Sequence, residues 1–282
     1  MTKATTPTLM TNASVLAKIR QWFGPNQEWL SLTCPLKERE FILVGSIHMG
    51  VPAMAPLPYA LRKLLRNCHA LVVEADLTQS QNLEIGSSTS GPILQQQLTT
   101  EQWRQFEAAC QECQLDPLTL AQYPAWQIGL TLQQKQAQML GLRPEFGVDH
   151  QLLSLAHHAD QPVIALESQQ QQLQLLTTLP NHGLDLLVDS LAHWRSNARQ
   201  LQKMIEWWLS KNHLSYSPLP ALSRSFGNDL QQRFIIQRNK QWVQQLLALP
   251  PGRYLVAVGA LHLSGPDNLI DLITSSKQEA SL

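Results

Sequence analysis

Two apolar runs in this sequence end in the same way, and this repetition constrains the fold more than any other feature. The runs cover residues 41–44 and 254–258, a glycine follows each of them, and a histidine stands three residues after each glycine, at His48 and His262. Short unbroken apolar runs are typical of strands that are covered on both faces of a sheet. We therefore expect two buried strands whose carboxyl ends bring the two histidines to one site.

Two further apolar runs end in carboxylates. Residues 70–76 read Ala-Leu-Val-Val-Glu-Ala-Asp and residues 162–167 read Pro-Val-Ile-Ala-Leu-Glu, which places Glu74 and Glu167 at the ends of predicted strands. A carboxylate in such an apolar setting is costly to bury unless it is paired, protonated or bound to a metal ion. Glu74 is therefore informative, and Asp149 lies in a neighbouring turn that precedes a predicted helix at residues 151–159.

The order of these segments predicts the fold class. An amphipathic helix predicted at residues 59–67 joins the first strand to the strand at residues 70–76, and the right-handed crossover of such a unit makes the two strands parallel. Residues of about 100–140 and 180–250 carry mainly helical patterns. We expect one α/β domain over residues 1–282, with a central, mostly parallel sheet flanked by helices and a large helical insertion or cap in the middle of the chain.

The charge balance argues against two classes of partner. The chain has 21 basic and 21 acidic residues and a net charge of zero, which removes the general electrostatic reason to expect binding to nucleic acid or to an anionic membrane surface. No apolar run approaches the length of a membrane span, and the first ten residues lack the apolar stretch of a signal sequence. We expect a cytoplasmic protein without nucleic-acid or membrane partners.

Two other groups of residues each allow two interpretations. Cys110 and Cys113 form a Cys-x-x-Cys within a helical pattern, so we expect semi-buried helix cysteines, with a zinc or redox role as the alternative. Trp207 and Trp208, with their apolar neighbours, either pack in the core or form an exposed patch that pairs two chains as a homodimer.

The polar residues at the strand ends predict chemistry. In open α/β sheets, ligands bind outside the carboxyl ends of the strands. Two imidazoles with one or two carboxylates can hold zinc, manganese, iron or cobalt and leave a position for a water that attacks a carbonyl. The same residues without a metal ion could act as a histidine general base and a glutamate acid or orienting group. Any one of these histidines, taken alone, could be structural.

Seven short motifs, in this order, resemble those of the TraB/GumN family over residues of about 40 to 275. This family is related to the Tiki metalloproteases and, more distantly, to erythromycin esterases and to a haem-binding lipoprotein of the ChaN type. The order and spacing of the motifs are specific, although no single motif is. The motifs lie at residues 44–48, 56–58, 71–76, 147–149, 166–169, 237–239 and 258–265.

The resemblance implies roles for individual residues. His48 and His262 match the paired Gly-x-x-His histidines, and Glu74 matches their acidic partner; in Tiki-like proteins these motifs belong to metal-dependent peptidase activity supported by manganese or cobalt. Asp149 matches a glycine-x-aspartate turn and is predicted as a further metal ligand. Arg238 matches the arginine of an Arg-Asn pair, where it either stabilises an oxyanion or forms a salt bridge that tethers its helix to Glu74 or Asp149.

Asn239 and Glu167 complete the predicted site as substrate-binding residues. Our first hypothesis is a metal-dependent hydrolase of peptides, which uses His48, Glu74 and His262 around a divalent manganese, cobalt or zinc ion. The second is a non-catalytic binding or regulatory protein that holds a peptide, a haem or another small ligand at the same place. The third is an esterase that needs no metal ion.

Overall fold

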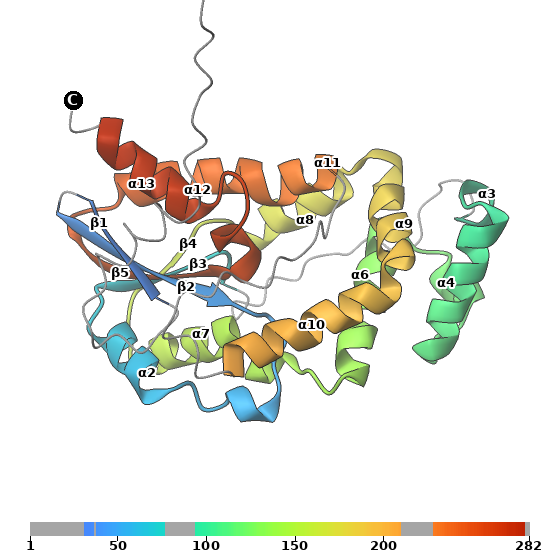
Figure 1. Ribbon diagram of the computed structural model, residues 1–282, viewed down its shortest axis with the longest axis horizontal. Helices are drawn as coiled ribbons and strands as arrows, with labels where there is room; N and C mark the ends of the chain where they lie inside the picture. The colour runs from blue at the N-terminus through green and yellow to red at the C-terminus, as the bar shows by residue number, and fades with distance from the viewer. Residues whose placement is uncertain (1–30, 37, 77–93, 210–227, 280–282) are drawn as a thin grey trace, which may run out of the picture.

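The protein contains a five-stranded sheet. The computed structural model describes residues 31–36, 38–76, 94–209 and 228–279. The strands are β1 (Ser31–Leu36), β2 (Arg39–Ser46), β3 (Ala70–Val73), β4 (Val163–Ala165) and β5 (Gly252–Gly259), and their order across the sheet is β1-β2-β5-β3-β4 (Figure 1). Only β1 runs antiparallel to its neighbour, while the other four strands are parallel. The predicted α/β class with a mostly parallel sheet is confirmed.

The last strand of the chain lies between two strands from its first third. β5 pairs with β2 so that Gly259 lies opposite Ser46, and it pairs with β3 so that Ala257 lies opposite Val73. The carboxyl ends of all four parallel strands therefore lie along one edge of the sheet. The crossover between β2 and β3 is parallel as predicted, but it skips one position, and β5 fills that position.

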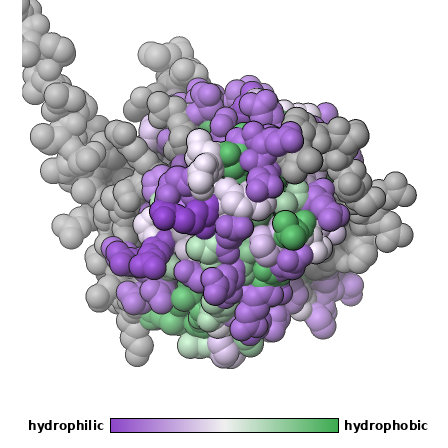
Figure 2. Space-filling view, turned by 90° about the vertical axis from the view of Figure 1, so that its right-hand side faces the viewer, coloured by the Kyte–Doolittle hydropathy of each residue, from purple (hydrophilic) through white to green (hydrophobic). Residues whose placement is uncertain are grey.

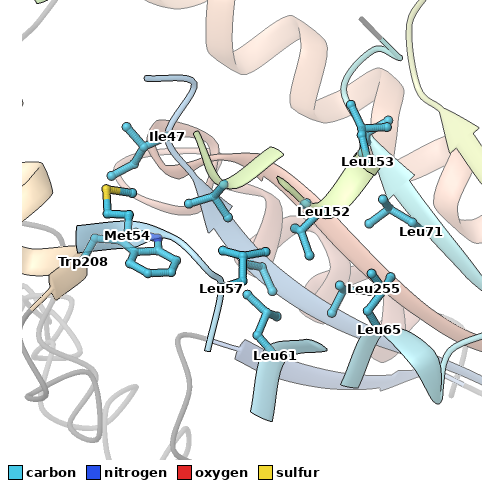
Figure 3. Packing of buried hydrophobic residues seen from close by; sticks show 14 of the residues in the cluster. Ile47, Met54, Leu57, Leu61, Leu65, Leu71, Leu152, Leu153, Trp208 and Leu255 are labelled. Atoms are coloured by element: carbon cyan, nitrogen blue, oxygen red, sulfur yellow. The ribbon is translucent and has the colours of Figure 1, made fainter. Parts of the chain in front are cut away.

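Alternate residues of the strands pack against helices on opposite faces of the sheet. One face packs against α2 (Tyr59–Arg66) and α7 (Val148–His158), and the other against α12 (Gln237–Ala248) and α13 (Leu269–Glu279) (Figure 1). Strands covered on both faces need unbroken apolar sequence, which explains the composition of these runs. Figure 3 shows the first face, where Leu71 and Leu255 of the sheet meet Leu61, Leu65, Leu152 and Leu153 of these helices.

Several of the helices that lie between β3 and β5 in the sequence form a second apolar core beside the sheet. Its buried residues include Phe106, Ile128 and Leu187. In the part of the chain that the structure describes, residues 100–140 and 184–209 are mainly helical as predicted, and the rest of the predicted helical stretch at residues 180–250 is described from Asn228 onward. The surface at this end of the molecule is largely hydrophilic, with hydrophobic residues gathered toward its lower edge in Figure 2. The helices are α3 (Leu94–Gln97), α4 (Thr100–Glu112), α5 (Pro117–Leu120), α6 (Ala125–Met139), α9 (Leu184–Ala192) and α10 (Trp194–Leu209).

Shorter elements connect the layers. These are the 3-10 helices η1 (Pro52–Met54), η2 (Pro144–Phe146), η3 (Pro180–Gly183) and η6 (Ala260–Leu263), the α-helices α8 (Gln169–Thr177) and α11 (Asn228–Gln231), and the π-helix η5 (Gln232–Ile236), which runs directly into α12. Within the described ranges, no helix combines the length and the apolar character that a membrane crossing requires.

The two residue groups with alternative interpretations both lie in the core. Cys110 and Cys113 are free and buried, and burial raises the pKa of the Cys110 thiol to about 12, which suits a structural role better than a redox or metal role. Trp208 is buried on the α2 and α7 face of the sheet together with Ile205, so these residues pack in the core (Figure 3). The homodimer stays a prediction.

Backbone hydrogen bonds join the loop after β2 to the loop before α7. The amide of Val148 donates to the carbonyl of Ile47 at 3.0 Å, and Gly50 and Arg143 exchange two hydrogen bonds of 2.9 and 2.7 Å. At Gly147 the backbones of the two loops are in direct contact, because a Cβ atom added there would lie 2.3 Å from the carbonyl oxygen of His48. This close approach places the His48 loop against the first turn of α7.

We predict that Gly147→Ala destabilises the protein, because its Cβ would meet backbone atoms that cannot rotate away. The expected loss is about 1–3 kcal/mol of unfolding free energy, measured by urea denaturation. Gly129→Ala is the matched control: its Cβ would make ordinary contacts of 3.6 Å or more, and it replaces a helix-interior glycine. That control should be neutral or stabilising, by up to about 1 kcal/mol. Equal stability of Gly147→Ala and the wild type would contradict the tight contact between the two loops.

Candidate functional site

The carboxyl edge of the sheet collects the polar residues that the sequence predicted. His48 follows β2, Glu74 directly follows β3, Glu167 follows β4, and His262 lies in η6 directly after β5. Arg238 and Asn239 lie in the first turn of α12. The parallel strands point their carboxyl ends toward the side of the molecule that carries α6 and α9 (Figure 1).

Glu74 and Glu167 lie side by side because the pairing of their strands continues beyond the strand ends. The amide of Leu166 donates to the carbonyl of Val73 at 2.9 Å, and the amide of Glu167 donates to the carbonyl of Glu74 at 2.8 Å. Directly after Glu167, the hydroxyl of Ser168 accepts from the amide of Gln171 and starts α8 with a capping box. The chain therefore turns away immediately behind the two carboxylates.

Arg238 is the centre of the site and pairs with both carboxylates. Its Nε and Nη2 donate to the two oxygens of Glu167 at 2.8 and 2.9 Å, and Nη2 also donates to Oε2 of Glu74 at 2.8 Å. Nη1 donates to the carbonyl of Phe234 at 3.1 Å and lies 3.3 Å from Nε2 of His262. The three charged side chains are only 10–12% exposed, so solvent screens these interactions weakly.

Two further groups hold these carboxylates. The amide of Gly259 donates to Oε1 of Glu74 at 2.6 Å, and the indole Nε1 of Trp242 donates to Oε1 of Glu167 at 2.9 Å. The ring of Trp242 also lies under Arg238, with the guanidinium carbon 4.6 Å from the ring centroid.

Glu74 is ionised in this setting. Burial acts to raise its pKa, but the charges of His262 and Arg238 and the amide of Gly259 hold the pKa below its ordinary value. Because His262 is itself neutral at pH 7, Arg238, the charge of His48 and the Gly259 amide are the partners that keep Glu74 ionised there.

His262 is a neutral imidazole with one defined tautomer. Its Nδ1 lies 2.7 Å from Oδ1 of Asn239, whose amide nitrogen donates to the carbonyl of Asp267 at 2.9 Å. The Asn239 oxygen must accept, so Nδ1 of His262 carries the proton and Nε2 presents a lone pair toward Arg238 and Glu74. Burial is the main cause that lowers the pKa of His262 to about 4, because it disfavours the charged ring.

His48 has the opposite environment. Its Nδ1 lies 2.8 Å from Oδ2 of Asp149, and 62% of its side chain is exposed against 14% for Asp149. The Asp149 carboxylate is the main cause that raises the pKa of His48 to about 9, and the exposure of the ring weakens this effect without reversing it. At pH 7 the two residues form an ion pair in which Nε2 of His48 is a proton donor.

The predicted metal ligands thus form two groups. His48 and Asp149 pair with each other, while Glu74 and His262 belong to the Arg238 network. Within the described part of the chain, no three His, Cys, Asp or Glu side chains are arranged to hold a metal ion. Both oxygens of Glu74 have donors, and Nη1 of Arg238 lies against the His262 lone pair that a metal ion would need. The residues, as placed, do not fit a divalent ion.

Asn239 and Glu167, which were predicted to bind substrate, make their contacts within the protein. Asn239 is 0% exposed, and its side chain orients His262, while Glu167 is the main partner of Arg238. Sequence reasoning overlooked Trp242, although it stands four residues after Arg238 and so on the same face of the helix. That spacing was the signal that could have found it.

The chain belongs to the TraB/PrgY/gumN family, which matches residues 35–279, and the resemblance seen in the motifs is thereby confirmed. Similar proteins include the uncharacterized protein YbaP of Escherichia coli (strain K12) and that of Shigella flexneri. Each is 42% identical to this chain over 251 residues, which covers 89% of this chain and 94% of the relative. No solved structure matches.

We predict that Asp149→Asn lowers the pKa of His48 from about 9 toward its ordinary value of 6.5, because the Asp149 carboxylate is the main cause that raises it. The raised pKa also means that this pair stabilises the fold fully below pH 6.5 and loses that effect as the pH rises through 9. The substitution should therefore flatten the fall in stability over this window. NMR titration of the His48 ring protons measures the pKa directly.

Glu145→Gln is the control for this titration, because Glu145 is an exposed carboxylate in the same connection. It should leave the His48 pKa unchanged. If Asp149→Asn also leaves it unchanged, Asp149 is not the partner of His48 in solution.

We predict that Asn239→Asp raises the pKa of His262 above about 4, since a carboxylate at this position would stabilise the charged ring. In the wild type the folded pKa lies below the ordinary value of 6.5, so the unfolded state binds more protons between pH 6.5 and 4. Stability should fall as the pH drops through this window. The fall should be smaller in Asn239→Asp and absent in His262→Gln, as measured by urea denaturation at several pH values. An equally steep fall in His262→Gln would assign it to other groups.

Proposed function

We propose that this protein is a hydrolase of peptide or ester bonds that works at the carboxyl edge of its sheet. One observation carries the proposal: the two Gly-x-x-His histidines have pKa values that are displaced in opposite directions, to about 9 for His48 and to about 4 for His262. Pairs of titratable groups whose environments separate their pKa values are typical of acid and base partners.

The roles follow from the protonation states. His262 is neutral at pH 7, so it is the candidate base for a water molecule that adds to the substrate carbonyl. Its Nε2 lone pair faces Nη1 of Arg238 at 3.3 Å, so in this proposal the water displaces that contact. His48 is protonated and its side chain is exposed, so it is the candidate acid that gives a proton to the leaving nitrogen or oxygen. The products are then a carboxylic acid and an amine or an alcohol.

Arg238 has a supporting role in this proposal. A guanidinium has five N–H donors, and the five hydrogen-bond contacts of Arg238 within the protein account for all of them. No donor is left for a substrate oxyanion. Of the two interpretations of this residue, the geometry favours the salt bridge, with Glu74 and Glu167 as its partners.

A metal-dependent peptidase is the specific form that the resemblance to Tiki-like proteins implies. A bound manganese, cobalt or zinc ion would supply an activated water. The side chains as placed do not fit such an ion, so we assign the chemistry to side chains alone, and the experiment below separates the two forms.

A second candidate is a binding or regulatory protein without catalytic activity. Two observations argue against catalysis by these groups and so favour this candidate over the hydrolase. Both carboxylates have their hydrogen-bond donors within the protein, and His262 is only 3% exposed. A buried network that needs no ligand for completion is equally consistent with a structural core.

The test is a cleavage screen with a peptide library and simple aryl esters, in EDTA and with added manganese, cobalt or zinc. In EDTA we expect a bell-shaped pH profile of kcat/KM, with an acid limb near 4 for His262 and an alkaline limb near 9 for His48. His48→Gln and His262→Gln should each lower kcat by roughly 10²–10⁴-fold. His193→Gln, at an exposed histidine between α9 and α10 whose ring pairs with Asp189, is the control and should retain activity.

Each other result has a defined meaning. Cleavage that requires an added ion and disappears in EDTA would overturn the side-chain mechanism and support the metal-dependent form. No cleavage under any condition would overturn the hydrolase and favour the binding protein.

A further inference from the structure

We infer that Arg238 is a built-in cation that fills the place of a metal ion, so that Glu74, Glu167 and His262 form a cation site occupied by the protein's own guanidinium. This inference concerns which cation the site holds, and it does not depend on the proposed hydrolase activity.

The atoms around the guanidinium are of the kinds that bind metal ions, although among the described residues no three such side chains are placed to hold an ion while Arg238 lies between them. Arg238 contacts both oxygens of Glu167, one oxygen of Glu74 and Nε2 of His262, at 2.8 to 3.3 Å. These carboxylates and this imidazole follow three adjacent parallel strands, β4, β3 and β5. Carboxylate oxygen and neutral imidazole nitrogen are common ligands of zinc and manganese.

The charge of the cluster also calls for a cation. The side chains of Glu74 and Glu167 are each 10% exposed and lie beside His262, and Arg238 is the cation in direct contact with both of them. Removing one partner of a buried ion pair leaves a charge that has lost its compensation. Without Arg238 the cluster would carry two adjacent negative charges, which is the arrangement that attracts a divalent ion.

Contacts with neighbouring residues fix the position of the guanidinium. Trp242 lies beneath it and also holds Glu167, while Nη1 is anchored to the carbonyl of Phe234. Phe234 belongs to the π-helix η5, which immediately precedes α12. Irregular turns of this kind change the direction of the residues that follow them and are frequent at functional sites. The start of α12 therefore positions the Arg238 side chain against Glu74, Glu167 and His262.

Compared with the predicted ligand set, this cluster lacks His48 and Asp149 and adds Glu167. His48 and Asp149 pair with each other, and Glu167 takes the position beside Glu74. The cation in this cluster is thus the guanidinium of Arg238, which lies at the start of α12.

The test measures metal binding directly. Tag-free protein dialysed against EDTA is titrated with Mn²⁺ and followed by electron paramagnetic resonance, and Co²⁺ binding is followed by its visible absorption. We expect no saturable binding to the wild type. Arg238→Ala should bind one ion per chain, and the added ion should raise its Tm.

Two further variants make the result specific. In the Arg238→Ala background, Glu167→Gln or His262→Ala should abolish the binding. Lys240→Ala is the matched control, because it removes a cation from the same helix at a residue whose partner is the exposed Asp267. It should behave as the wild type does and bind no ion.

The inference is overturned if the wild type binds one ion per chain that His262→Ala removes, or if folded Arg238→Ala binds none. If Arg238→Ala does not fold alone, refolding is repeated with Mn²⁺ present, and failure to recover the fold with the ion also counts against the inference. Arg238→Lys, which keeps the charge and loses the fork of donors, should fold and bind no ion. Because these measurements use no substrate, an absence of hydrolysis does not affect them.

Discussion

The burial of two carboxylates around one guanidinium is the constraint on which the rest of the structure depends. Leaving a buried charge without its partner costs about 3–5 kcal/mol, a large share of the stability of an ordinary domain. The ends of β3 and β4, which carry Glu74 and Glu167, must therefore meet the first turn of α12, which carries Arg238. The apolar face of α12, with Trp242 and Leu246, then packs on the sheet beside them.

The same motif acquires two different chemical characters because its two copies enter different surroundings. His262 lies in a 3-10 turn beneath Trp242 and α12, where burial removes the charge and Asn239 fixes the tautomer. His48 has an exposed side chain on a loop that backbone hydrogen bonds tie to the start of α7, where Asp149 preserves the charge. Position in the fold, and not the local sequence, thus separates a neutral imidazole from a charged one.

Much of the fold could be predicted because the physical signal is local. Unbroken apolar runs identify the buried strands, and parallel pairing puts the polar residues that follow them along one edge. Strand order could not be predicted, because periodicity shows which residues are buried and not which strands pair, and β5 separates β2 from β3. For the same reason the sequence left open whether Arg238 meets Glu74 or Asp149, and it gave no sign that Glu167 is the main partner.

The glycine of the second Gly-x-x-His motif shows why a motif alone does not define chemistry. The amide of Gly259 donates to Oε1 of Glu74, and a Cβ atom at this position would lie 3.0 Å from that oxygen, so a side chain here would crowd the carboxylate. The glycine thus leaves room for, and donates a hydrogen bond to, Glu74, which follows a different strand. Its role is not limited to the histidine three residues later. The glycine of the second motif is therefore explained by its contact with Glu74, whereas Gly45 of the first motif packs against Ala260 and Leu263. The two copies share a sequence pattern, but their glycines have different structural reasons.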